Sequence, residues 1–295
     1  MSVLEVRKST TDRTRRVAAR LIERMLPAAG AALAERLWFT VPTVSTDRNG
    51  SPAPIGRPFA VTVGGRSVRG QSWGDGRVVY LVHGWGGWGG QLVAFVQPLV
   101  EAGYRVVTFD SLSHGESDPG ALGRRRSTLV ELADVLAAVV EEHGQPAGIV
   151  AHSLGGTATA LALRAGLKAD RVVLVAPMAD PAPYLAAFVR GLGFGRRVLR
   201  HTQRLVERRA GLALADIDVP RVAAEVDTPP VLVVHDRDDK EVAWSDGSAI
   251  AGTWPDATLL TTTGLGHRRI LRDPIVLAEV ASFLRHEIRH QRISS

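Results

Sequence analysis

The sequence predicts an α/β fold, with a mostly parallel central sheet flanked by helices on both faces. Short apolar runs alternate with helix-like segments between residues 78 and 175, and again after residue 231. Such alternation is typical of parallel strands joined by crossover helices. The 295 residues, 45% hydrophobic and 22% charged, are enough for one large domain with an insertion or for two small domains.

The first fifty residues precede this alternation and predict a helical extension of two helices that ends near Trp38. Apolar side chains recur there at helical spacing, with arginines largely elsewhere around the helix: Val17, Leu21, Ile22 and Met25 against Arg13, Arg16, Arg20 and Arg24. We expect this amphipathic helix to dock on its own domain, with weak contact to a membrane surface as the alternative. The charges in V-A-A-R-L-I-E-R argue against an export signal after Arg15-Arg16.

A loop rich in Gly, Pro, Asn and Asp, T-D-R-N-G-S-P-A-P-I-G-R-P, leads from the extension into the main domain. The expected strands that follow span residues 59–63, 67–73, 78–82, 105–109, 148–151, 171–175, 231–234 and 258–262. Gly64-Gly65 joins the first two strands as a hairpin. The expected helices span residues 92–101, 127–142, 153–165 and 274 to about 290.

Residues 177–226 interrupt the alternation with helical or irregular signals only. We therefore predict three parts: an N-terminal extension and linker over residues 1–50, a core over 51–176 and 227–295, and a cap or lid inserted at 177–226.

Composition excludes some kinds of site. The chain has no cysteine, which excludes disulfides and thiolate metal sites. This fits a reducing compartment, and we expect a cytoplasmic location, although a chain without cysteine is also tolerated outside the cell. No run of about 18 apolar residues predicts a membrane-spanning helix. The net charge of +6 comes largely from arginines in residues 7–24 and 190–209. We interpret both runs as solvated helix faces and expect no nucleic-acid partner.

Three loops carry residues suited to chemistry. In A-H-S-L-G, Ser153 follows an apolar strand and precedes a helix, with the small residues Ala151 and Gly155 on either side. This pattern is typical of a nucleophilic serine on a sharp turn, although Ala151 replaces the usual glycine. The second loop, L-V-H-G-W-G-G-W-G-G at residues 81–90, follows a strand and lacks the spacing of a phosphate-binding loop. The third loop contains Asp110 and His114, which we expect to order a turn beside the site.

Together these motifs resemble the α/β-hydrolase fold family over residues 59–290: H-G-W-G at 83–86, Asp110 with H-G-E-S at 114–117, and A-H-S-L-G-G at 151–156. The resemblance implies a helical cap on the α/β-hydrolase fold and a catalytic triad in the order serine, acid, histidine. The acid then follows the strand after the cap, where Asp239 is the candidate and Asp238 the alternative. A metal site is the competing interpretation of these aspartates.

The histidine is expected after the last strand, where G-L-G-H supplies His267. His286 and His290 are expected on the surface of the final helix. The backbone N–H groups of Trp85 and Leu154 would form the oxyanion hole. The implied function is a serine hydrolase, carboxylesterase-like, acting on a small-molecule ester, thioester or lactone through an acyl-serine, without metal or organic cofactor.

Two alternatives stay open at this point: a noncatalytic binding protein on the same fold, and a non-hydrolytic enzyme such as an acyltransferase or lyase. Apolar cap residues could contact an acyl group or could pack the lid itself: Tyr184, Leu185, Phe188, Leu192 and Phe194. Arginines 196, 197, 200 and 204 could attract an anionic substrate. The sequence does not indicate the oligomeric state.

Overall fold

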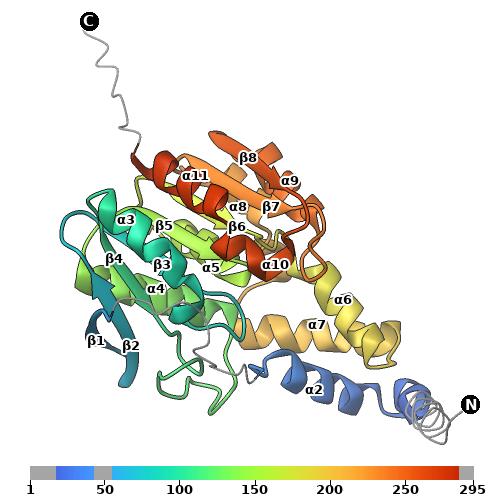
Figure 1. The fold of residues 1–295 in the computed structure, drawn as a ribbon. Helices are drawn as coiled ribbons and strands as arrows, with labels where there is room; N and C mark the ends of the chain where they lie inside the picture. The colour runs from blue at the N-terminus through green and yellow to red at the C-terminus, as the bar shows by residue number, and fades with distance from the viewer. Residues whose placement is uncertain (1–17, 43–54, 286–295) are drawn as a thin grey trace, which may run out of the picture.

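The computed structural model describes residues 18–42 and 55–285. Within them, eight strands form one sheet in the order β1-β2-β4-β3-β5-β6-β7-β8 (Figure 1). The pairs β1–β2 and β2–β4 are antiparallel, and all pairs from β4 to β8 are parallel. The strands are β1 (Arg57–Val63), β2 (Arg66–Trp73), β3 (Val78–Val82), β4 (Arg105–Phe109), β5 (Pro146–His152), β6 (Val172–Val175), β7 (Val231–Asp236) and β8 (Ala257–Thr262). The predicted mostly parallel α/β sheet is confirmed.

Helices surround the sheet and extend beyond it on one side. A helix over residues 18–25 precedes α2 (Pro27–Trp38), α3 (Val96–Glu101), α4 (Leu129–His143), α5 (Leu154–Arg164), α6 (Pro181–Gly191), α7 (Arg196–Ala210), α8 (Val219–Glu225), α9 (Trp244–Thr253), α10 (Gly266–Arg269) and α11 (Pro274–Arg285). Short 3-10 turns are η1 (Gly89–Phe95), η2 (Leu214–Asp216) and η3 (Ile270–Arg272). The two expected N-terminal helices and the end near Trp38 are confirmed.

Two segments differ from expectation. Residues 92–101 form η1 followed by α3 rather than one helix. Pro98 explains the break, because it has no N–H to continue the α-helical hydrogen bonds into η1 and is tolerated only in the first turn of α3. Helix α9 was not expected, since W-S-D-G-S-A-I-A-G-T contains two glycines and few strong helix formers. It forms where it packs on β7 and β8.

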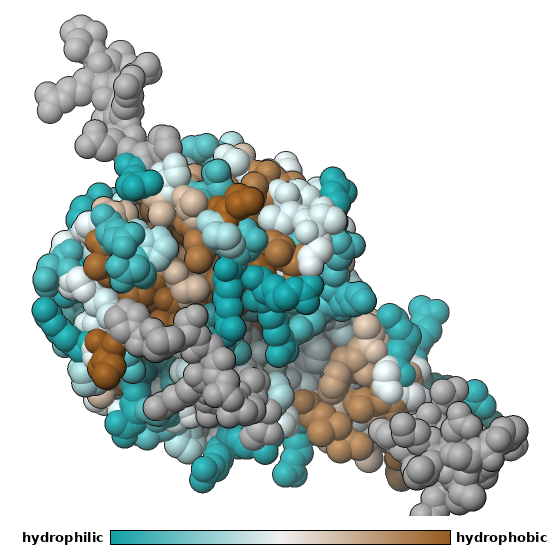
Figure 2. Space-filling view, in the orientation of Figure 1, coloured by the Kyte–Doolittle hydropathy of each residue, from teal (hydrophilic) through white to brown (hydrophobic). Residues whose placement is uncertain are grey.

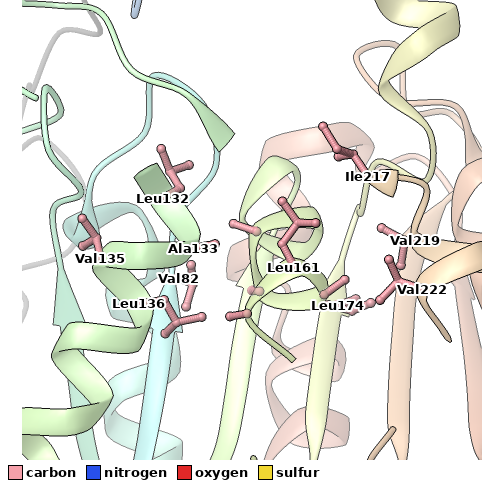
Figure 3. Close-up of a cluster of buried hydrophobic side chains, with 14 of the residues drawn as sticks. Val82, Leu132, Ala133, Val135, Leu136, Leu161, Leu174, Ile217, Val219 and Val222 are labelled. Carbon is pink, nitrogen blue, oxygen red and sulfur yellow. The ribbon is translucent and has the colours of Figure 1, made fainter. Parts of the chain in front are cut away.

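The core lies on both faces of the sheet, and the side chains of β3 contribute to both faces. Val78, Tyr80 and Val82 belong to one buried cluster, while Val79 and Leu81 belong to the other. Successive side chains of a strand point to opposite faces, so an entirely apolar strand indicates a sheet covered on both sides. Figure 3 shows the first cluster, in which Leu136 of α4, Leu161 of α5 and Val222 of α8 pack over Val82 of β3 and Leu174 of β6.

The predicted hairpin between β1 and β2 turns at Gly64 and Gly65. Both residues have positive φ, +54° and +76°, a conformation that glycine adopts without strain and that most other residues avoid. The turn fixes a register that pairs Val63 with Arg66 and carries through to Arg57 opposite Ser72.

The N-terminal helices pack on the segment predicted to form the cap. Helix α2 lies along α7, and α6 adjoins both, in a group at one side of the sheet (Figure 1). Glu35 of α2 is buried and bonds Arg209 of α7 at 2.8 Å, while Arg126 lies 3.5 Å from the same carboxylate. Of the segment 177–226, α6 and α7 stand away from the sheet, whereas α8 packs against α5 and α9.

Several expectations concern residues outside the described ranges. These are the positions of Val17, Arg13 and Arg16 on the first helix, most of the linker, and His286 and His290 on the last helix. Among the described residues, no helix has the length and apolar character needed to cross a membrane.

Candidate active site

The site lies at the carboxyl ends of the parallel strands, where the loops after β3, β5, β7 and β8 meet. Ser153 is the single residue between β5 and α5, with φ +53° and ψ −125°. For a residue other than glycine this backbone conformation costs on the order of 1–3 kcal/mol, so the surroundings must impose it. Two hydrogen bonds do so: Ser153 N donates to Val175 O at 2.9 Å, and Gly156 N donates to Ser153 O at 2.9 Å.

Small residues allow this turn to form against the loop after β3. A Cβ on Gly155 would lie 2.6 Å from the carbonyl oxygen of His83, and one on Gly84 would lie 2.9 Å from Cβ of Ser153. Both distances are shorter than real contacts permit. Ala151, two residues before the serine, is fully buried in β5. The sheet therefore accommodates its methyl group in place of the glycine usual in the motif.

His267 and Asp239 are joined by a short hydrogen bond, 2.7 Å between Nδ1 and Oδ2. The carboxylate is fully buried, and the imidazole is nearly so. With Nδ1 donating to the carboxylate, Nε2 of His267 is left as the proton acceptor. As expected, His267 follows the last strand, and it lies in the short helix α10.

In the loop after β7, Asp238 and Asp239 accept hydrogen bonds from different partners. Asp239 Oδ1 accepts from the N–H groups of Glu241 and Val242 at 2.8 and 3.0 Å, which leaves Oδ2 for His267. Asp238 instead accepts from Gly264 N at 2.9 Å. The structure thus brings Asp239, and not Asp238, to the imidazole.

Asp236 holds the loop that carries His267. Its buried Oδ2 accepts from the Thr262 hydroxyl at 2.7 Å and from Leu265 N at 3.0 Å. The carboxylates of Asp236, Asp238 and Asp239 thus accept hydrogen bonds from backbone N–H groups, a hydroxyl and a histidine ring. Among residues 18–42 and 55–285, no group of three His, Asp or Glu side chains is arranged to hold a metal ion.

His235 is a second histidine beside Asp239, and it was not among the site residues expected from the sequence. Its Nε2 lies 3.4 Å from Asp239 Oδ2 and 3.2 Å from Val242 O. A Cβ on Gly247 would lie 2.5 Å from its Nδ1, so the glycine makes room for the ring. Burial by itself raises the pKa of Asp239, but hydrogen bonds from His235, His267 and Val242 N outweigh it and hold that pKa well below its usual range. Asp239 is therefore ionised at neutral pH.

The loop after β3 makes a tight turn at the candidate oxyanion hole. Gly87 N donates to Gly84 O at 3.0 Å, and Gly86 has φ +66°, as the third residue of a type II turn requires. Trp85 sits in this turn, and its Nε1 donates to Thr40 O at 3.3 Å, which ties the loop to the end of the N-terminal extension. The described residues include no acceptor for the backbone N–H groups of Trp85 and Leu154.

Two side chains stabilise this loop, His83 at its start and Asp110 directly after the next strand, β4. His83 Nδ1 donates to Gly84 O at 2.8 Å, and its Nε2 accepts from Ser111 N at 2.9 Å. Burial lowers the pKa of His83 to about 4, so the ring is neutral. Asp110 accepts from Gly89 N at 2.7 Å and from Glu116 N at 2.8 Å. As expected, Asp110 orders the turn after β4, and it is Asp239 that contacts the His267 imidazole.

His114 and His152 are also buried. His114 lies 5.0 Å from the His83 ring and 5.5 Å from the Trp85 ring, between centroids, and its Nε2 has no partner among the described residues. His152 Nε2 donates to His267 O at 3.0 Å, and the two rings lie 4.6 Å apart. This contact brings His267 to the residue that adjoins Ser153. No direct hydrogen bond joins Ser153 Oγ to His267 in the described part of the chain. In enzymes, the distance between a nucleophile and its base often shortens to hydrogen-bond length only when substrate binds.

A cavity of about 390 Å³ adjoins the turn after β3. It is lined by Val41, Pro42, Gly86, Gly87, Trp88, Ser113, His114, Gly115, Ser117, Asp118, Pro119, Arg124 and Arg125. The cap side chains contribute mostly to packing, since Leu185 and Phe194 are buried in the core and Phe188 and Leu192 pack against it. Tyr184 ties α6 to the start of α9, because its hydroxyl donates to Asp246 at 3.0 Å.

Comparisons with known proteins agree with the fold. A model of the alpha/beta hydrolase family matches residues 79–280, more than half of the chain. The chain belongs to the alpha/beta hydrolase family. A non-heme chloroperoxidase from Kitasatospora aureofaciens is 35% identical to this hydrolase-family chain over 104 residues, which are 34% of the chain and 35% of the relative. The matched part thus spans about a third of the length of that relative.

Solved structures extend the likeness of this family member to most of the fold. An N-acyl homoserine lactone degrading enzyme has a TM-score of 0.58 at 18% identity, covering 76% of this chain and 99% of its own. An esterase from Exiguobacterium antarcticum has 0.58 at 16%, covering 77% and 99%. A thioesterase domain from the curacin biosynthetic pathway has 0.59 at 18%, covering 78% and 98%. At these identities the likeness concerns the fold.

Proposed function

We propose that the protein is a serine hydrolase that cleaves an ester-type bond, a carboxylic ester, thioester or lactone, through an acyl-serine intermediate. Ser153 is the nucleophile, His267 the general base and Asp239 the acid of the triad. The observation that carries the proposal is the pairing of a strained serine turn with a buried imidazole–carboxylate hydrogen bond at the same edge of the sheet. The hydrolases among the structural neighbours support the bond class.

In this proposal His267 Nε2 takes the proton of Ser153 Oγ as the oxygen attacks the carbonyl carbon. Asp239, already ionised, holds the Nδ1 proton and stabilises the imidazolium that forms. The backbone N–H groups of Trp85 and Leu154 donate to the tetrahedral oxyanion, and in other enzymes one such donor contributes about 10²–10³ in rate. His267 then protonates the leaving group, and water releases the acid from Ser153 by the same steps in reverse.

The test is labelling with a fluorophosphonate serine probe, together with hydrolysis of short p-nitrophenyl esters. We expect the protein to be labelled, and Ser153→Ala to lose both labelling and hydrolysis. Ser117→Ala is a matched control, since Ser117 is a second serine at the sheet edge whose hydroxyl is hydrogen-bonded to Asp110 O. A folded protein with neither labelling nor hydrolysis would favour the noncatalytic binder.

One second candidate has its own support, the similarity to a non-heme chloroperoxidase. Here hydrogen peroxide replaces water in the second step: its oxygen attacks the acyl carbon, the bond to Ser153 breaks, and a peracid leaves as the serine regains its proton. The candidates separate when the ester is turned over with peroxide present. With bromide and a halogen-acceptor dye present, the peracid oxidises bromide to hypobromous acid, which halogenates the dye. Dye bromination that requires Ser153 favours perhydrolysis, and release of carboxylic acid alone favours hydrolysis.

A further inference from the structure

Exposed apolar side chains concentrate on the N-terminal helices. Of seven large hydrophobic residues exposed in the described part of the chain, five lie between residues 21 and 37, with exposed fractions from 39% to 70%. They are Leu21, Met25, Leu26, Leu33 and Leu37, here called the outer face. In Figure 2 hydrophobic surface gathers beside the N-terminal helices, in the region where Figure 1 draws α2. Monomeric soluble proteins seldom expose apolar side chains in such a group without a partner.

The charges around the outer face have one sign. Residues 18–42 contain three arginines, Arg20, Arg24 and Arg36, and all are exposed. The only two acids there, Glu23 and Glu35, are turned inward. Glu23 accepts from backbone N–H groups at the start of α7, the nearest being Arg197 N at 2.8 Å, and Glu35 is buried against Arg209.

The packing of the extension on α7 separates the acids from the arginines. The acids that would neutralise the arginines instead attach the extension to α7, and α7 adds exposed arginines of its own, among them Arg200 and Arg204. The outer face is thus apolar and cationic, on helices that are already formed and packed. A surface of this kind binds without the entropy loss of ordering a helix on contact.

We propose that the outer face docks the protein on a membrane surface that contains anionic lipid. Its leucines and Met25 enter the interface between headgroups and acyl chains, while the arginines pair with lipid phosphates and carboxylates. A second copy of the chain fits less well, because symmetric contact would bring arginines against arginines. The segment over residues 1–17 also carries more cations than acids, five against two, and so matches the charge of the outer face rather than opposing it. The proposal does not depend on the proposed hydrolysis.

Flotation of the full-length protein with lipid vesicles tests the proposal. The vesicles contain phosphatidylcholine with phosphatidylserine, or phosphatidylcholine alone. We expect flotation with the anionic vesicles and loss of flotation at high salt. Arg20→Gln/Arg24→Gln/Arg36→Gln should weaken partitioning by about a hundredfold, from the contribution typical of a cation near an anionic leaflet. Leu21→Ser/Met25→Ser/Leu33→Ser/Leu37→Ser should abolish it.

Matched controls change the same chemistry elsewhere. Arg69→Gln/Arg272→Gln/Arg285→Gln removes three exposed arginines, and Ile275→Ser removes an exposed apolar side chain from α11. Both should float like the unaltered protein. Circular dichroism and thermal unfolding check that every variant folds.

Three results would overturn the proposal. One is no flotation with anionic vesicles at low salt. Another is flotation that both outer-face variants retain but deletion of residues 1–17 abolishes, since binding then belongs to that segment. The last is that the unaltered protein binds no vesicles and sediments as a dimer, whereas the variant with four apolar side chains of the outer face changed to serine sediments as a monomer. The outer face is then an interface between copies.

Discussion

The hydrogen bonds of Asp239 make Asp239→Asn a sharp test of the proposed triad. Oδ1 accepts from two backbone N–H groups, so an asparagine must place its amide oxygen there. The NH₂ group then faces His267 Nδ1 and His235 Nε2. Because the NH₂ group can only donate, it forces the His267 proton onto Nε2, where the ring can no longer accept the proton of Ser153.

The expected loss follows from this wrong tautomer and from the missing charge beside the imidazolium. Comparable substitutions in other serine hydrolases lower kcat by about 10⁴, which corresponds to about 5 kcal/mol of transition-state stabilisation. The assay is kcat for a p-nitrophenyl ester, with thermal unfolding to confirm the fold.

Asp238→Asn is the matched control. Within residues 18–42 and 55–285, the Asp238 side chain accepts a hydrogen bond only from Gly264 N, and an amide oxygen can do the same. We expect its kcat to change less than about tenfold, as for one altered hydrogen bond. Asp239 is not the acid of a triad if folded Asp239→Asn keeps kcat within tenfold of the unaltered protein, or if Asp238→Asn loses as much.

Three further predictions concern packing, the buried ion pair and pH. Gly155→Ala should lower kcat at least tenfold, because its Cβ would lie 2.6 Å from a backbone carbonyl; Gly252→Ala, with open space around it, should leave both kcat and stability nearly unchanged. Glu35→Gln should lower the free energy of unfolding in urea by about 3 kcal/mol, since it leaves arginines without their buried partner; an unchanged midpoint would contradict this. Burial lowers the pKa of His114 to about 3, below the value of about 6.5 expected in the unfolded chain. Between these two pH values the unfolded state binds more protons than the folded state, so the free energy of unfolding falls as pH drops from about 6.5 towards 3. His114→Gln should reduce that slope by about 1.4 kcal/mol per pH unit in urea titrations, and an unchanged slope would contradict this.

Much of the fold follows from local pattern. The buried strands were predictable because each contains a short apolar run, and the hairpin because Gly64-Gly65 supplies two positive φ values. The serine turn was recognisable because close packing demands small residues at fixed positions beside Ser153. Helix α9 was not predictable, because contacts with β7 and β8, rather than its own weak propensity, determine its conformation.

The finer geometry of the site depends on contacts far apart in the chain. Asp238 and Asp239 are adjacent in sequence, and only the path of the loop after β7 directs one to Gly264 and the other to His267. His235 contributes to the site only because Gly247, twelve residues later, leaves space for its ring. The close contact between the N-terminal extension and the loop after β3, through Thr40 and Trp85, gave no signal in the sequence.

The most direct test of the central claim is to trap the acyl-serine. The protein is mixed with p-nitrophenyl acetate, quenched in acid during turnover, digested and analysed by mass spectrometry. We predict an acetyl group on the peptide that contains Ser153, at Ser153 itself, and no acetylation of that peptide in Ser153→Ala. Turnover of the ester with an unmodified Ser153 peptide, or with an acetyl group that persists at another residue in Ser153→Ala, would contradict it.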